Sequence, residues 1–418
     1  MGLSVNRSAS APRRAAFIFV FITVLLDMLA LGMIIPVLPK LVMGFLGGDT
    51  AKAARVFGVF GTVWALMQFF FAPVLGSVSD RFGRRPVILL SNFGLACDYV
   101  LMALAPTLGW LFVGRVISGI TAASVPTASA YIADVTPPEK RAGAFGMLGA
   151  AFGLGFVLGP ALGGLLGSVD PRLPFWASAG LSFANALYGL FVLPESLPRE
   201  KRAPFSLKGA NPLGSLKLLR SRQGLLLLSV LAFLGALAHE SLPSTFVLYA
   251  QYRYGWDERL VGLTLAAVGV CTGVVQAALV GPIVGRFGER ASLFVGLFCG
   301  AVGFATYGLA ARGSTFWLGI PVMAIWGLSG PAVQGLMSSK VGPSDQGQLQ
   351  GATGSLRGIS GLIGPTLYTL ALATFISPQA PFKLPGAPFV LSAALLGLSF
   401  LIAVALLPRS VSAASDAA

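Results

Sequence analysis

The sequence predicts an all-α membrane protein of twelve transmembrane helices, arranged as two repeats of six helices. Composition is the first observation behind this prediction. Apolar residues make up 55% of the 418 residues and Asp, Glu, Lys and Arg only 11%, against roughly 25% charged residues in a soluble domain. The second observation is a series of twelve apolar runs, each long enough to cross a bilayer. The third is a set of motifs that recurs at one fixed offset along the chain.

The apolar runs have the length and continuity of membrane-spanning helices, because about 20 helical residues cross a hydrocarbon core of ~30 Å. Arg13 and Arg14 before the first run could indicate a secretory signal, but the run contains Asp27 and lacks a small-residue cleavage site, so we expect a retained helix. The predicted spans are 15–39, 56–75, 86–105, 108–131, 142–167, 174–194, 224–250, 260–282, 291–311, 314–336, 350–376 and 387–408.

The charge distribution predicts the orientation of these spans. The chain carries 29 Lys and Arg and 15 Asp and Glu. With the N-terminus in the cytoplasm, 19 basic residues fall in inside segments and 8 in outside segments, and Arg115 and Arg357 lie inside or at the edge of spans. This bias follows the positive-inside rule. It predicts the lipid bilayer of the cytoplasmic (inner) membrane as the partner of the chain, with both termini cytoplasmic, and argues against nucleic acid.

One long polar connection divides the spans. Residues 195–223 are rich in proline and basic residues. They predict an N-terminal six-helix bundle over 1–194, a cytoplasmic linker over 195–223 and a C-terminal six-helix bundle over 224–418.

An internal repeat supports the same division. One offset of 205 residues relates two distant motifs, and parallel repeats of this kind are typical of transporters. The recurring residues are Gly76, Arg81, Phe82, Gly83 and Arg85, matched by Gly281, Arg286, Phe287, Gly288 and Arg290, and Gly159 and Pro160, matched by Gly364 and Pro365.

Two motifs indicate changes between conformations. In the loop after the second span, Asp80 can pair with nearby Arg residues, and glycines allow close approach; we expect Arg84 to serve only as a positive-inside anchor. In the fifth span, small residues permit close helix packing and Pro160 permits a bend. The residues concerned are Gly76, Asp80, Arg81, Gly83 and Arg85 in the loop, and Gly155, Gly159, Pro160 and Gly164 in the span.

These two motifs resemble the loop motif and the antiporter motif of the major facilitator superfamily. Further strings, such as Gly32–Pro39 and Gln346–Gly351, are similar to those of tetracycline/proton antiporters. The resemblance implies export driven by protons, with no other cofactor. It implies functional charges at Asp27, Asp98 and Arg115. The chain departs from that family at Thr272 and Gly300, where the family carries a histidine and an aspartate.

Charged residues inside spans are costly, about 2.5–3.5 kcal/mol for a carboxylate at mid-bilayer, so each should face a partner or water. Asp27 or Asp98 could pair with Arg115 or handle substrate and protons. Glu240 lies three residues before Pro243, which should break the helix. Burial favours the protonated form of a carboxyl. Glu240 could therefore carry the proton in place of the histidine and aspartate that are absent at Thr272 and Gly300, or it could be hydrogen-bonded within the kink.

Five polar or aromatic residues within spans are candidates for substrate contact by hydrogen bonding or stacking, although each could equally be structural. They are Gln68, His239, Gln276, Trp326 and Gln334.

Together these features predict a proton-coupled antiporter that exports a small amphipathic, drug-like compound and acts as a monomer. The alternative is proton-coupled uptake of a sugar-like or carboxylate solute. We expect no enzyme, because G-x-S-x-G, H-E-x-x-H and Walker-type strings are absent, and no metal site, because His239 is the single histidine.

Overall fold

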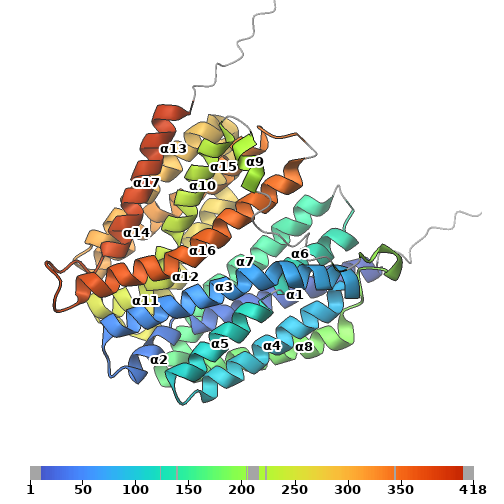
Figure 1. Cartoon of the computed structure of the whole chain (residues 1–418), viewed down its shortest axis with the longest axis horizontal. Coiled ribbons are helices and arrows are strands. Elements are labelled where there is room, and N and C mark those ends of the chain that lie inside the picture. The colour runs from blue at the N-terminus through green and yellow to red at the C-terminus, as the bar shows by residue number, and fades with distance from the viewer. Residues whose placement is uncertain are drawn as a thin grey trace, which may run out of the picture.

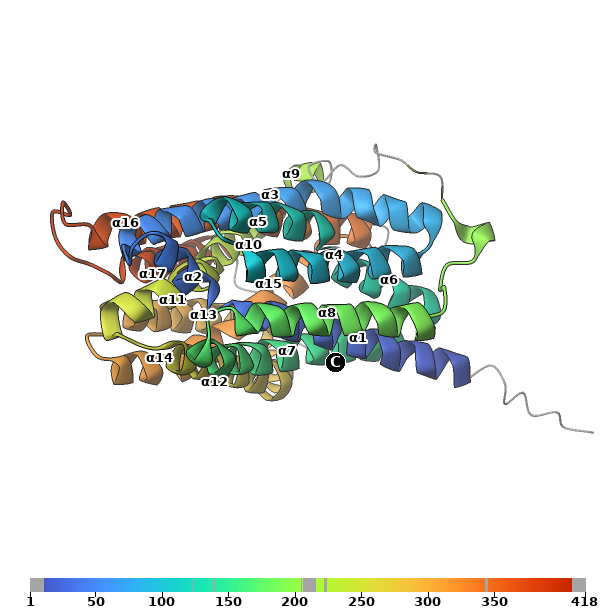
Figure 2. The same cartoon turned by 90° about the horizontal axis from the view of Figure 1, so that it is seen from below.

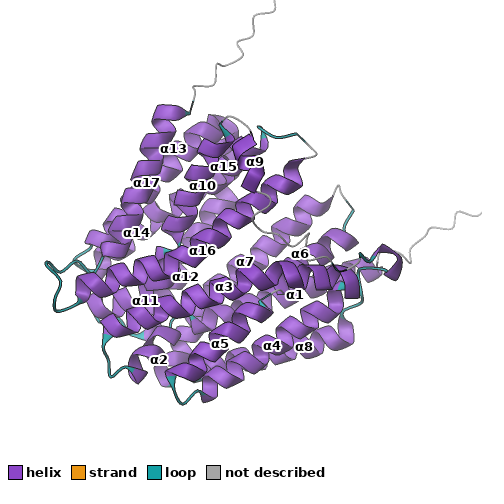
Figure 3. Ribbon diagram, viewed as in Figure 1, coloured by secondary structure: helices purple, strands orange, loops and turns teal. Residues whose placement is uncertain are grey.

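The computed structural model describes residues 11–122, 124–137, 140–203, 205, 216–221, 224–342 and 345–407, and these residues form helices and connecting loops without a strand (Figure 3). The helices of the first half are α1 (Ala11–Ile34), α2 (Leu38–Phe45), α3 (Thr50–Phe82), α4 (Arg84–Leu104), α5 (Leu108–Thr121), α6 (Ser124–Val135), α7 (Arg141–Val169) and α8 (Leu173–Val192). Those that follow are α9 (Lys217–Ser221), α10 (Leu225–His239), α11 (Ser241–Tyr254), α12 (Glu258–Val274), α13 (Val280–Leu309), α14 (Gly313–Ile325), α15 (Ser329–Ser338), α16 (Gln346–Ile376) and α17 (Ala387–Leu406).

The described residues contain 11 stretches long and apolar enough to cross a membrane. One of them, Glu258–Leu309, has 52 residues and would measure about 78 Å at 1.5 Å per residue. A π-helical turn at Val275–Leu279 joins α12 to α13. Within α13 the chain turns at Gly288, where φ is 79° and ψ is 166°. This stretch therefore crosses twice, and the described chain has the twelve predicted crossings.

The first eight helices lie together on one side of the molecule and α10–α17 on the other (Figure 1). The two groups diverge toward the side where α1 begins and α17 ends, which we call the terminal face. They approach one another toward the side that carries α2, which we call the α2 face. Figure 2 shows the long helices running from one face to the other.

The repeat found in the sequence is also present in the backbone. Gly83 and Gly288, 205 residues apart, both turn the chain with positive φ, at 108° and 79°, a conformation that glycine adopts without a Cβ clash. After each turn an arginine binds the end of the last helix of its own half. Arg85 Nη2 donates to Leu190 O at 2.6 Å, and Arg290 Nη2 donates to Leu407 O at 2.9 Å.

Two helix crossings join the halves near the α2 face, α3 with α16 and α7 with α12. Each of the duplicated prolines lies at one of them. Pro365 packs against Gly61, where an added Cβ would lie 2.8 Å from the proline Cβ, and Gly262 packs against the carbonyl of Pro160. Glycine is required at both places because it lets the backbones approach closely.

Polar contacts also join the halves near the α2 face, one at the crossing of α3 with α16 and one between α2 and α12. Thr62 Oγ1 lies 2.8 Å from Thr366 Oγ1, and Lys40 Nζ lies 2.7 Å from Glu258 Oε1. The structure is therefore closed toward the α2 face and divergent toward the terminal face.

Candidate functional site

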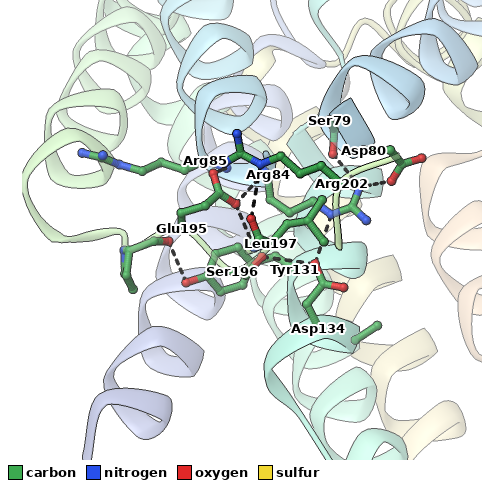
Figure 4. Close-up of polar contacts among 12 residues, drawn as sticks. Ser79, Asp80, Arg84, Arg85, Tyr131, Asp134, Glu195, Ser196, Leu197 and Arg202 are labelled. Atoms are coloured by element: carbon green, nitrogen blue, oxygen red, sulfur yellow. Dashed lines mark hydrogen bonds and ion pairs between the residues drawn. The ribbon is translucent and has the colours of Figure 1, made fainter. Parts of the chain in front are cut away.

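Arg84 is the centre of a polar network at the terminal face (Figure 4). Its Nη1 atom lies 2.6 Å from Asp80 Oδ1 and donates to Ser79 Oγ at 2.7 Å, while Nε donates to Asp134 Oδ2 at 3.1 Å. The expectation that Arg84 is only a positive-inside anchor is therefore wrong, because one guanidinium joins the ends of α3, α4 and α6. Asp80 pairs with an arginine as predicted.

Glu195 caps the start of α4 from a distant part of the chain. Its carboxylate accepts hydrogen bonds from the backbone N–H groups of Arg84 at 2.8 Å and Arg85 at 3.3 Å. A negative group at a helix N-terminus is stabilised by unpaired N–H groups and the helix dipole. Gly83 makes room for this carboxylate, since an added Cβ would collide with it. Glu195 was not among the residues predicted from the sequence to have a functional role.

The expectation that this motif lies in a loop is wrong, because α3 continues to Phe82 and only Gly83 separates it from α4. The remaining residues of the motif behave differently from one another. The Arg81 guanidinium lies over the Phe82 ring at 5.2 Å, as Arg286 does over Phe287 at 5.6 Å in the second half. Gly76 has no atom within 4 Å of an added Cβ, so close packing does not account for a glycine there.

The small residues of α7 serve two interfaces. Gly155 and Gly159 face α1, where an added Cβ would collide with Met28 and Gly32 respectively. Gly164 faces α12, against the backbone of Glu258. The motif thus packs α7 onto its own half and onto the opposite half at once, and Pro160 lies inside the helix at this crossing.

Asp98 and Arg115 form an ion pair inside the first half. Asp98 on α4 is fully buried and Arg115 on α5 is 8% exposed. Arg115 Nη2 lies 3.7 Å from Asp98 Oδ2 and 3.1 Å from Met102 Sδ. Of the two acids that could pair with Arg115, the structure thus pairs Asp98.

Replacing Arg115 by Met should lower stability by about 3–5 kcal/mol, because it leaves a buried carboxylate without its cation. We expect a lower unfolding temperature for the purified protein. The double variant Asp98→Asn with Arg115→Met should recover most of the loss. An unfolding temperature for Arg115→Met equal to that of the wild type would contradict a structural role for the pair.

Asp27 on α1 points toward α8. It is 4% exposed, and Asn185 Nδ2 donates to its Oδ1 atom at 3.0 Å and to Thr23 O at 3.1 Å. Asp27 therefore lies within the first half, held by an amide.

Glu240 occupies the break between α10 and α11. The break follows from Pro243, which has no N–H to offer the carbonyl of His239 four residues earlier. The Glu240 side chain is half-buried and packs on α16, where an added Cβ at Gly364 would collide with its Cβ and Cγ atoms. Gly364 precedes Pro365, which contacts the opposite half at Gly61. Glu240 thus packs on the residue that directly precedes a contact between the halves.

His239, Gln276 and Trp326 come together in the second half. The exposed His239 ring lies 5.8 Å from the Trp326 ring, and Gln276 Nε2 donates to Gly327 O at 3.1 Å. The cluster combines aromatic faces with a polar edge, which suits a flat amphipathic molecule.

The two other candidate glutamines, Gln68 and Gln334, make no hydrogen bond with this cluster among the described residues. Gln68 is half-buried on α3, directly before Phe69, which packs against Gly358 of α16. Gln334 is half-buried on α15, and its Nε2 atom has no hydrogen-bond partner among the described residues.

Comparison with known proteins identifies the family of this chain. Residues 20–365 match the family model described as Major Facilitator Superfamily. The chain belongs to the Major Facilitator Superfamily. It is 39% identical to the tetracycline resistance protein, class C, of Escherichia coli over 365 residues, which cover 87% of this chain and 91% of that relative. It is 36% identical to the class B protein of Escherichia coli, over 83% and 86% of the two chains.

Solved structures of the superfamily agree with this. The human organic anion transporter MFSD10 (TETRAN) is 26% identical, with 94% of this chain and 99% of that chain aligned and a TM-score of 0.69. The xylose transporter XylE from E. coli shares the fold, with a TM-score of 0.72, 15% identity and coverage of 96% and 99%. The chain is an integral multi-pass membrane transporter of the superfamily, not an enzyme.

One of the two departures from the tetracycline/proton antiporters has a structural cause in this superfamily member. A Cβ at Gly300 would lie 2.7 Å from Trp326 Cδ1 and 2.8 Å from Leu396 Cδ1. Trp326 and Leu396 therefore fill the space that an aspartate would need. The side chain that excludes it, Trp326, is itself part of the aromatic cluster.

Proposed function

We propose that the chain is a proton-coupled antiporter that exports a small amphipathic, drug-like compound. Its relatives at 36–39% identity are named as tetracycline resistance proteins. The observation that carries the proposal is the position of Glu240, an ionisable group whose stem packs on Gly364, beside the contact of Pro365 with the other half. A change of its charge can act directly on the contact that must open and close during transport.

The proposal includes an orientation. The terminal face lies in the cytoplasm of the cell that carries the protein in its inner membrane. The distribution of Lys and Arg supports this, because 19 of the 29 fall in the segments that the sequence predicts to be inside, as the positive-inside rule requires. In this orientation the structure is divergent toward the cytoplasm, the state in which an exporter receives its substrate.

Transport then follows alternating access. The crossings of α3 with α16 and of α7 with α12 separate, and the terminal faces of the two halves approach. Glu240 then takes up a proton from the far side of the membrane and releases it to the cytoplasm. This step returns the protein to the state that is open to the cytoplasm. The equilibrium shifts only if proton and substrate bind the two states with different affinities.

Everted membrane vesicles test this function. With the interior acidified by an ATP-driven proton pump, tetracycline as the first probe should accumulate inside and partly dissipate the proton gradient, and an uncoupler should prevent accumulation. Loss of a preloaded sugar or carboxylate from these vesicles, without tetracycline accumulation, would favour the uptake permease instead.

Asp27→Asn is expected to abolish proton-driven accumulation in the same vesicles if Asp27 takes part in coupling, while the protein still reaches the membrane, since an amide can keep the contact with Asn185 seen at 3.0 Å. The measurement is the initial rate of tetracycline uptake at matched protein levels. A wild-type rate would leave Asp27 as the structural partner of Asn185 and remove it from the mechanism.

A further inference from the structure

Arg357 is a charged side chain that the site described so far does not use. It is the twelfth of the 31 residues of α16, well inside the span. It is exposed, and among the described residues no hydrogen bond or ion pair satisfies its guanidinium. A permanent positive charge at membrane depth is costly unless it faces water or a counter-ion.

The direction of Arg357 around α16 shows what it faces. Ile363 and Leu370 are 45% and 46% exposed and mark the lipid side of the helix. At 100° per residue, Arg357 lies about 120° around the helix from Ile363 and about 140° from Leu370. It lies within about 20° of Gly364, which packs on Glu240. Arg357 is thus exposed on the inner side of the helix.

Its neighbours place it at the boundary of the two halves. The next residue, Gly358, packs against Phe69 of α3, from the opposite half. Within the second half, the charge of Arg357 acts on His239 of α10. His239 in turn lies 5.8 Å from Trp326. A fixed cation therefore lies on the side of α16 that faces away from lipid, and its charge reaches the exposed His239 ring, which lies beside the half-buried Trp326.

Given a transport pathway between the halves, as proposed above, we propose that Arg357 binds the negatively charged group of the transported compound and that His239 and Trp326 contact its flat ring system. The substrate class is then an organic anion with an aromatic body. The guanidinium presents donors in a planar fork that matches a carboxylate or a similar oxyanion. Glu240 is not the counter-ion of Arg357, because it is not within 4.0 Å of any Lys or Arg among the described residues.

A pair of probes that differ only in charge tests this inference. We would titrate the purified full-length protein with 1-naphthoate and with 1-naphthamide, using isothermal titration. The wild type should bind the anion at least about tenfold more tightly than the amide, since a charge-assisted hydrogen bond contributes about that much. Arg357→Gln should remove this preference, and Arg357→Lys should keep part of it.

Two further variants separate charge from shape. Trp326→Leu should weaken both probes by a similar factor, because it alters the contact with the ring and not with the charge. Arg312→Gln, an exposed arginine at the start of α14, removes the same net charge elsewhere and should bind like the wild type.

Equal affinity of the wild type for the two probes, or an unchanged preference in Arg357→Gln, would overturn the inference. The wild-type comparison needs no variant and stays decisive if Arg357→Gln does not fold. These titrations need no proton gradient. A preference for the anion that persists in a protein without proton-driven flux would therefore retain this inference and reject the proposed antiport.

Discussion

Replacing Glu240 by Gln is expected to reduce proton-driven transport to the level of vesicles without the protein, while folding and ligand binding are preserved. Gln has nearly the same shape and can keep the packing of the Glu240 stem on Gly364, but it cannot release or take up a proton. The variant should still exchange substrate across the membrane in counterflow without a proton gradient, because the two halves can still move when the carrier is permanently neutral.

The measurements for this variant are initial uptake rates with and without an imposed pH gradient, together with counterflow at equal pH. The matched control is Glu200→Gln, which makes the same chemical change in the exposed turn Arg199–Lys201, outside the spans, and should transport like the wild type. Gradient-driven uptake at the wild-type rate in Glu240→Gln would remove Glu240 from proton coupling. If Asp27→Asn were inactive at the same time, the carrier would be Asp27.

Replacing Gly262 by Leu should abolish transport by keeping the α2 face open. The added side chain would collide with the Pro160 carbonyl and with Gly164 Cα of α7. Overpacking within a core costs about 1–3 kcal/mol, but here the two halves can separate and relieve it without unfolding. The conformational equilibrium should therefore shift from the state seen in this structure, in which α7 and α12 pack closely, to a state in which this crossing is open.

Distances between spin labels at Gly44 and Arg259, both exposed at the α2 face, would report this opening. The distance should increase in Gly262→Leu relative to the wild type. Gly273→Leu on the same helix is the matched control, because no atom lies within 4 Å of a Cβ added there; it should keep the wild-type distance and transport rate. A wild-type distance in Gly262→Leu, with transport retained, would mean that this crossing does not need a close backbone approach.

Several features of the molecule follow from local sequence and could be predicted. The spans are set by the length of the apolar runs, and the break in the seventh span is set by Pro243 because a proline cannot complete the helical hydrogen bond. The turns at Gly83 and Gly288 share a positive φ because the same string occurs 205 residues apart. Apolar length, proline and glycine act on the backbone within one or two helical turns, so no partner is needed to interpret them.

The partners of polar side chains could not be obtained in this way. Asp98 pairs with Arg115, whereas Asp27 is held by Asn185, 158 residues away in the sequence. Arg84 joins three helix ends although its place in a basic string indicated only an anchor. The sequence places Arg357 inside or at the edge of a span, and only the contacts of α16 show that it faces the boundary between the halves.

The sequence by itself therefore determined that this protein lies in a membrane, that it crosses the membrane twelve times and that its two halves repeat the same pattern of turns. These properties depend on hydrophobicity and on backbone preferences that each segment carries alone. The tertiary structure decided which charges are paired and which lie where the halves meet. Those outcomes depend on the rotation of each helix about its axis and on the neighbour it packs against, which only long-range packing specifies.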